Sequence, residues 1–159
     1  MFTEQLYTGT KEENERLLLK QLEGLIEDEP SQLANLANAS ALLQQFLSDI
    51  NWVGFYLLDG EELVLGPFQG KPACTRIKVG RGVCGTAVSR GEAVLVADVH
   101  QFPGHIACDS ASNSELVIPL KRDGAVIGVL DIDSPLFSRF DETDLATLTA
   151  FVNILEKYL

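Results

Sequence analysis

The sequence lacks any long uninterrupted apolar run. No stretch approaches the roughly 18 to 20 residues that a membrane-spanning helix needs. The segment from Met1 to Tyr7 also has no basic stretch followed by an apolar one, which a secretory leader would show. We therefore predict neither a transmembrane helix nor a leader, and we expect the chain in the cytoplasm.

Basic residues are scarce too. The chain has 12 Lys and Arg against 23 Asp and Glu, a formal net charge of -11. This charge repels nucleic-acid phosphates and anionic lipid headgroups, so neither is an expected partner. Glycine and proline number only 13 and 6 among 159 residues, of which 46% are hydrophobic. That composition excludes a largely disordered chain and suffices for one buried core.

Cysteines are few and odd in number. Cys74, Cys84 and Cys108 are ten and twenty-four residues apart and form no CxxC pair. The spacing fits neither a disulfide framework nor the usual zinc site. We predict free or transiently paired thiols, and no metal or cofactor.

The hydrophobic pattern predicts helices at both ends of the chain. Thr10 and Glu13 have the spacing of a capping box, and apolar residues follow at helical spacing. Ser31 can cap a second helix. A last helix is expected to start within residues 140–144, because an apolar face follows them.

Between these helices the period changes to that of strands. Hairpin turn signals stand at residues 59–60 and 123–124. The predicted class is α+β, a single domain over residues 1–159. It has an antiparallel sheet of five or six strands with the N- and C-terminal helices packed on it. Strands are expected at residues 52–58, 63–65, 75–79, 93–96, 116–120 and 125–133, and a short helix at 83–88.

A polar segment at residues 98–114 is the predicted working loop, because unstructured loops of this length are unusual unless they have a function. Cys108 lies in it beside His105, Asp109 and Ser112, where an inert apolar cysteine has no packing reason to be. We therefore predict a reactive Cys108. Cys84, at a loop-to-helix junction, could be a thiolate favoured by free N–H groups and a nearby arginine, or a buried small residue.

Three carboxyl groups are predicted to converge. Asp131 and Asp133 share one face of a strand, and the preceding hairpin sets Glu115 opposite roughly Ile132. Carboxyls crowded over Ile132, Val129 and aromatic rings raise one another's pKa. One can then stay protonated as a general acid while another binds an ammonium group. The alternative is that the strand ends there and both aspartates point into water or cap residues 134–135.

Five segments together resemble the free methionine-(R)-sulfoxide reductases, enzymes built on a single GAF domain. GAF domains in general share the architecture but not the three cysteines together with the three acids. The resemblance runs over nearly the whole chain, and no motif position departs from it. The segments are residues 51–56, 66–74, 80–87, 105–115 and 128–135.

The resemblance implies reduction of free L-methionine-(R)-sulfoxide to methionine. Cys108 would be the nucleophile and become a sulfenic acid, which Cys74 would resolve as a disulfide. Cys84 would be a second resolving or relay thiol, and thioredoxin would restore the dithiol. The oligomeric state stays open, a homodimer included.

The resemblance also implies the substrate contacts. Glu115, Asp131 and Asp133 would hold the sulfoxide oxygen and the amino group, with Glu115 and Asp133 at the oxygen. Trp52 and Tyr56 lie on one face of the first strand, a pattern more often found in a core than in a pocket. In the family they would line a slot for the methyl group.

A non-catalytic GAF module is the alternative function. Such a module would bind a small ligand or sense oxidants through the same thiols. GAF sensors are usually joined to an output domain, and this chain has no residues left over for one, so we favour the enzyme.

Overall fold

Helices at both ends of the chain and strands between them follow the predicted order. The computed structural model describes residues 6–159, so residues 1–5 of the predicted domain lie outside the described part. The elements are α1 (Lys11–Ile26), α2 (Gln32–Phe46), β1 (Trp52–Asp59), β2 (Glu62–Gly70), β3 (Arg76–Lys78), α3 (Gly82–Arg90), β4 (Val94–Val96), the 3-10 helix η1 (Val99–Gln101), β5 (Ser114–Arg122), β6 (Ala125–Ser134) and α4 (Glu142–Glu156).

The predicted helix starts are confirmed by their caps. The Thr10 hydroxyl accepts the backbone N–H of Glu13 at 3.2 Å, and the Glu13 carboxylate accepts the N–H of Thr10 at 2.8 Å. Ser31 caps α2 in the expected way. A second capping box starts α4 from Asp141, inside the predicted range. Each cap satisfies N–H groups that the first helical turn leaves unpaired.

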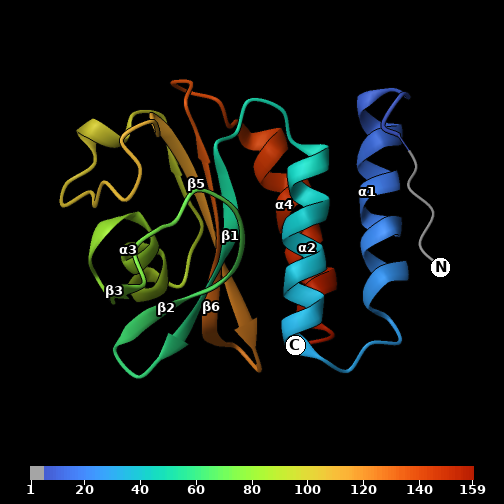
Figure 1. Ribbon diagram of the computed structural model, residues 1–159, viewed down its shortest axis with the longest axis horizontal. Helices are drawn as coiled ribbons and strands as arrows, with labels where there is room; N and C mark the ends of the chain where they lie inside the picture. Colours follow the sequence, from blue (N-terminus) through green and yellow to red (C-terminus); the bar gives the residue numbers. More distant parts are fainter. Residues whose placement is uncertain (1–5) are drawn as a thin grey trace.

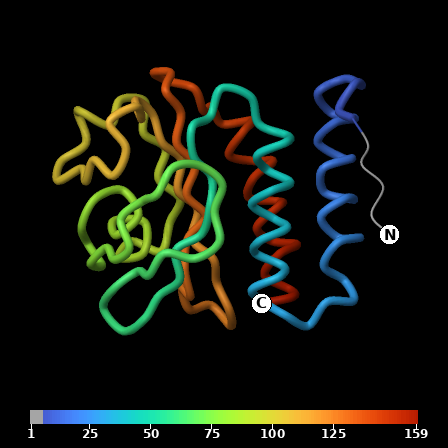
Figure 2. The backbone as a smooth tube through the Cα atoms, in the orientation of Figure 1, coloured from blue at the N-terminus to red at the C-terminus, as the bar shows by residue number. Residues whose placement is uncertain are grey.

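The six strands form one antiparallel sheet, as predicted. Their order across the sheet is β3-β2-β1-β6-β5-β4, so the two hairpins meet where β1 pairs with β6 (Figure 2). The central strands are therefore β1 and β6. This pairing places the start of β1 beside the end of β6, where the predicted aspartates lie.

The sheet has helices on both faces. α2 and α4 cover one face, and α1 packs against α2 and α4 as a further layer rather than on the sheet itself (Figure 1). α3 packs on the opposite face, over β5 and β6. None of the helices in the described residues is long and apolar enough to cross a membrane.

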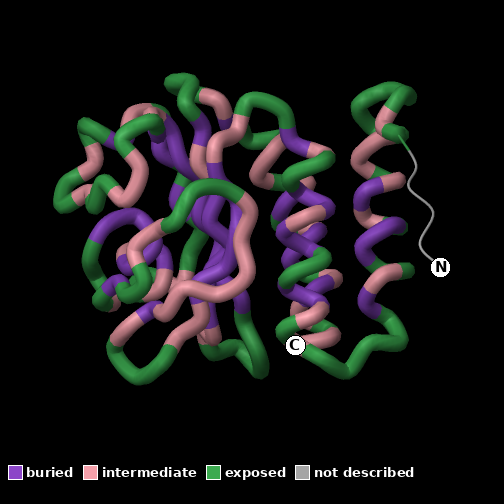
Figure 3. Tube along the Cα trace, viewed as in Figure 1, coloured by how far each residue is buried: buried purple, intermediate pink, exposed green. Residues whose placement is uncertain are grey.

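The face under α2 and α4 holds the larger apolar core. Leu116 and Leu130 from the sheet pack there with Leu43 of α2 and Phe151 of α4, all fully buried. Figure 3 shows buried residues along the sheet and along the helices that cover it. Ile132 belongs to this core, so the expectation that it floors a pocket on the other face is wrong. Strand residues alternate between faces, and its neighbours therefore point the opposite way.

Candidate active site

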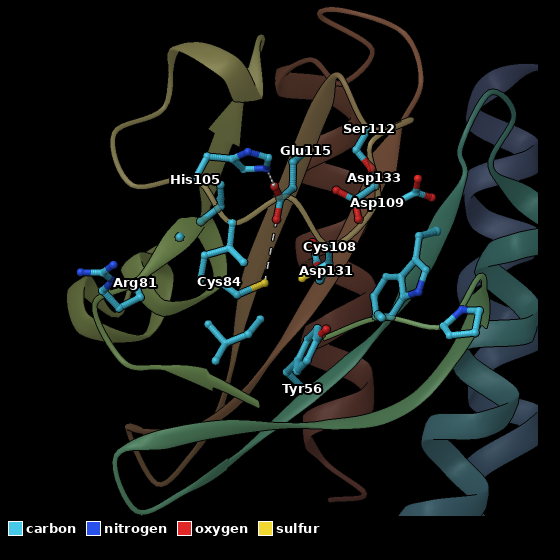
Figure 4. Close-up of a pocket in the computed structure, with 17 residues that line it drawn as sticks. Tyr56, Arg81, Cys84, His105, Cys108, Asp109, Ser112, Glu115, Asp131 and Asp133 are labelled. Carbon is cyan, nitrogen blue, oxygen red and sulfur yellow. Dashed lines mark hydrogen bonds and ion pairs between the residues drawn. The ribbon is translucent and has the colours of Figure 1, made fainter. Parts of the chain in front are cut away.

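A pocket opens on the sheet face that carries α3 (Figure 4). It lies between the ends of β1, β5 and β6, α3, and the loop of residues 97–113, here called the Cys108 loop. The predicted site residues that line it are Trp52, Tyr56, Cys84, Cys108, Glu115, Asp131 and Asp133. The remaining one, Cys74, is bonded to Cys108.

A β-bulge in β6 decides which residue lies opposite Glu115. In the hairpin of β5 and β6 the pairing shifts by one residue between Leu120 and Lys121, so Glu115 lies opposite Asp133. The predicted partner, near Ile132, is off by that one residue. Without the shift Glu115 would pair with a residue of the helix-side core. Alternation along β5 turns Glu115 toward the pocket, and the bulge sets it directly opposite Asp133.

The acids stand in cross-strand rows on the pocket face. Asp133 of β6 lies between Trp52 of β1 and Glu115 of β5. Asp131 is two residues back on the same strand and pairs with Gly54. The predicted convergence of the three carboxyls is confirmed, and the alternative of two aspartates pointing into water is not.

Burial sets the protonation of this acid cluster. Glu115 and Asp131 are each only 6% exposed, and Oδ1 of Asp131 has no hydrogen-bond partner. Burial raises the pKa of Asp131 to about 6. Burial first, and then the charge of Asp131, raise the pKa of Glu115 and of Asp133 well above the usual range. The cluster therefore retains protons near neutral pH.

Cys84 faces the acid cluster from the first turn of α3. Its Sγ donates to Oε1 of Glu115 over 3.9 Å. Burial raises the pKa of the thiol, and the charges of Asp131 and Glu115 raise it further. The alternative of a thiolate favoured by the helix terminus and Arg81 is not supported, because Cys84 is a buried neutral thiol.

Cys108 forms a disulfide with Cys74, the pairing that the resemblance implies. Their Cα atoms are 5.5 Å apart, although the residues are 34 apart in sequence. The Tyr56 hydroxyl donates to the carbonyl oxygen of Cys74 at 2.8 Å. The backbone segment that carries Cys74 is thereby fixed to β1, within reach of the Cys108 loop.

Trp52 and Tyr56 form one wall of the pocket. The Trp52 ring lies between those of Tyr56 and Phe68, with centroids 5.9 and 5.2 Å apart, and its indole N–H donates to the Lys71 carbonyl oxygen at 3.1 Å. A Cβ at Gly54 would lie 2.8 Å from the indole, so only glycine leaves room for it there. The sequence left open whether Trp52 and Tyr56 belong to the core or to a pocket. In the structure both rings are buried and both line the pocket.

Three polar residues of the Cys108 loop also line the pocket: His105, Asp109 and Ser112. Nε2 of His105 lies 4.0 Å from Oε2 of Glu115, and burial lowers the pKa of its imidazole, which is therefore neutral. The sequence marks this segment as the working loop. It does not show which of its side chains turn inward.

Cys84 and two acids of the cluster lie close enough together to be considered as metal ligands. One ligand atom each of Cys84, Glu115 and Asp131 lie within 4.8 Å of one another. A thiol must lose its proton to bind a metal, and the raised pKa of Cys84 opposes this. The thiol of Cys84 instead keeps its proton and donates it in a hydrogen bond to Glu115. We therefore assign no metal to these three residues.

Comparison with known proteins identifies close relatives. The GAF domain family matches residues 32–159. The free methionine-R-sulfoxide reductase of Escherichia coli is 58% identical over 142 residues, which cover 89% of this chain and 86% of that protein.

Two solved structures extend the comparison. One is the reduced form of a Staphylococcus aureus protein named fRMsr, 59% identical, with a TM-score of 0.89 over 92% of this chain and 95% of that one. The other is a free methionine-R-sulfoxide reductase from Neisseria meningitidis in complex with its substrate. It is 49% identical, with a TM-score of 0.94 over 99% and 95% of the two chains.

Proposed function

Since this chain belongs to the free methionine-R-sulfoxide reductases of the GAF family, we propose that its pocket reduces free L-methionine-(R)-sulfoxide to L-methionine at Cys108. The observation that carries the proposal is the disulfide between Cys74 and Cys108 at a pocket in which three carboxyls converge. Such a site joins a thiol nucleophile to a proton source, the two parts that this reduction needs.

The chemical step begins from the dithiol form. The Cys108 thiolate attacks the sulfoxide sulfur, and a carboxylic acid gives a proton to the sulfoxide oxygen as the S–O bond breaks. In the net change the substrate sulfur gains two electrons and leaves as the thioether of methionine. The Cys108 sulfur loses those electrons and ends as a sulfenic acid that carries the oxygen.

Cys74 then resolves the sulfenic acid. Its thiol attacks the Cys108 sulfur, a disulfide forms, and the oxygen leaves as water. Cys84 remains a candidate second resolving or relay thiol. Its raised pKa makes it a weak nucleophile at neutral pH and favours Cys74 for this step.

We assign the proton transfer to Glu115 and Asp133. They are direct cross-strand neighbours, and the pKa of each is raised well above the usual range, so that a protonated carboxyl is available. Asp131 would lie nearer the substrate ammonium, with its charge offset by that cation. An unpaired carboxylate oxygen on Asp131 supports this role.

Trp52 and Tyr56 would hold the methyl end of the substrate. Their stacked rings give a flat apolar wall beside the acids. If the pocket binds the substrate through its ammonium group, it leaves no room for peptide bonds at the amino end. Free methionine sulfoxide is therefore favoured over the same residue in a polypeptide. The fixed wall would also favour one configuration at sulfur.

The disulfide must be reduced for another turnover, and we propose thioredoxin as the reductant. Cys74 and Cys108 are both partly exposed, which supports access by an external dithiol. A homodimer also stays a proposal, which light scattering of the purified chain tests. Location in the cytoplasm, where thioredoxin keeps thiols reduced, stays a prediction.

The direct test supplies a dithiol reductant and four substrates: each sulfur diastereomer of methionine sulfoxide, free and within a short peptide. We expect methionine chiefly from the free R form, and none with Cys108→Ser. Equal rates on free and peptide-bound substrate would contradict the closed pocket. A non-catalytic sensor would form the disulfide with oxidants but release no methionine.

A further inference from the structure

Asn51 ties the Cys108 loop to the strand that carries the acids. Its backbone N–H donates to the carbonyl oxygen of Asp133 at 2.9 Å. Its side-chain Nδ2 donates to Oδ2 of Asp109 at 3.1 Å and to Oγ of Ser112 at 3.0 Å. Because a carboxylate oxygen accepts and never donates, these partners also fix which way the amide points. One residue thus spans the end of β6 and the loop positions that follow Cys108.

Asp109 is held from a second side as well. Its Oδ1 accepts the backbone N–H of Ala111 at 2.9 Å. This bond, and then the one from Asn51, lower the pKa of Asp109, with a further contribution from the charge of Lys71. Asp109 therefore carries a fixed negative charge, and its side chain lies beside Asp133 in the pocket (Figure 4).

This charge acts on Asp133 together with the groups around it. Burial is the largest cause that raises the pKa of Asp133, followed by the charges of Asp131 and then Asp109. Of these charges, only that of Asp109 comes from the Cys108 loop, where Asp109 directly follows the nucleophile Cys108. The other ionisable groups that line the pocket, element by element, are Tyr56 on β1, Arg81 and Cys84 at α3, His105 on the loop and Glu115 on β5. Lys71, after β2, does not line the pocket but acts on Asp109 through its charge.

We propose that Asn51 and Asp109 are a positioning pair for the reduction: Asn51 sets the Cys108 loop against the acid cluster, and Asp109 holds a negative charge beside the carboxyl of Asp133. Neither residue supplies a reacting atom. The pair acts through Cys108, the residue before Asp109, and through Asp133. The proposal rests on the function given above.

Two substitutions separate the two roles. Asn51→Ala removes both side-chain hydrogen bonds but leaves the charge of Asp109. Asp109→Asn removes the charge and keeps the tie, because Asn51 can turn its amide over and accept from the new amide and from the Ser112 hydroxyl. Asp98→Asn is the matched control, since Asp98 lies in the same loop, caps η1 and does not line the pocket.

The first measurement is the single-turnover rate of methionine formation against pH. Asp109→Asn should move the high-pH loss of rate downward by about one pH unit, because a like charge no longer disfavours ionisation of Asp133. Asn51→Ala should lower the rate roughly tenfold or more at every pH, since the nucleophile is less well placed. Asp98→Asn should match the wild type. An Asp109→Asn profile that overlies the wild-type profile would overturn the electrostatic role.

The second measurement does not depend on catalysis. The disulfide form is treated with dithiothreitol, and the rate at which Cys74 and Cys108 are released is followed. Asn51→Ala should speed release severalfold, because the loop opens more often without its tie. The other two variants should stay near the wild type. If release is unchanged in a folded Asn51→Ala protein, the tie is refuted. If release is faster while the wild type reduces no sulfoxide, the tie stands and the proposed function fails.

Discussion

The two faces of the sheet are built from alternate residues of the same strands, yet they differ in chemistry. On β6, Leu130 and Ile132 enter the apolar core under α2 and α4, whereas Asp131 and Asp133 point into the pocket. Apolar burial on the first face stabilises the fold. Carboxyl burial on the second face opposes folding and raises the pKa of the acids. The helix-side face therefore stabilises the fold. The pocket face lowers the stability of the fold but keeps carboxyl groups protonated near neutral pH.

The largest effect should come from the pocket face, at the nucleophile. Cys108→Ser should abolish even one turnover, whereas Cys74→Ser should release up to about one methionine per enzyme and then stall with thioredoxin. Rapid-quench product analysis separates the two outcomes. Normal cycling of Cys74→Ser alongside failure of Cys84→Ser would assign resolution to Cys84 instead.

The helix-side face should respond in stability. Leu130 is fully buried, so Leu130→Ala should destabilise the fold by about 2–5 kcal/mol through lost burial and a cavity. Urea unfolding at fixed pH measures this. A loss below 1 kcal/mol would mean that this face does not provide the stability assigned to it.

The acids of the pocket face should control the chemical step. Glu115→Gln or Asp133→Asn should lower the single-turnover rate by roughly 10² or more, the usual scale for losing a general acid, with a smaller effect on substrate binding. Stopped-flow rates at saturating substrate and equilibrium binding distinguish the two. Full rates with weakened binding would make the cluster an ammonium site alone, and the proton would come from water.

The smallest effect should be a gain in stability at Asp131. Its folded-state pKa of about 6 lies above the ordinary value of 3.8. The folded state therefore binds this proton more tightly, and its ionisation disfavours folding above pH 6. Asp131→Asn should stabilise by about 1–3 kcal/mol at pH 8, and the gain should vanish as the pH falls from 6 to 4. Thermal melts across that range test it, and a gain that grows toward acid would contradict the sign.

Much of the fold follows from local patterns, because caps, turns and periodicity act over a few residues. The capping box of α1, the start of α4 within residues 140–144 and the turn at 123–124 lie where the sequence predicts them. The first hairpin turn lies at 60–61, one residue after the predicted position, because Asp59 still pairs with Glu62. The bulge at Ile127 of β6, opposite Leu120 and Lys121, leaves no such local signal. Counting back from the turn therefore misplaces the partner of Glu115 by one residue. The expectation that Ile132 floors the pocket fails for a separate reason, because alternation along β6 turns Ile132 away from Asp131 and Asp133.

The site was predictable to the extent that its residue types are unusual for their positions. Acids on an apolar strand and a cysteine in a polar loop both stand out. Asn51 and Asp109 do not, because amides and carboxylates are common in turns. Their roles depend on hydrogen bonds between segments 58 residues apart. The burial of the Cys84 thiol among acids likewise arises only when α3 packs on the sheet.

The most direct test joins the chemistry to the disulfide. Reduced protein is mixed with one equivalent of free L-methionine-(R)-sulfoxide without a reductant, quenched over time, and analysed for methionine and by peptide mapping. We predict one methionine for each Cys74–Cys108 disulfide formed, with Cys84 still a free thiol. Methionine released while Cys108 stays a stable sulfenic acid, or a disulfide formed without methionine, would contradict the account.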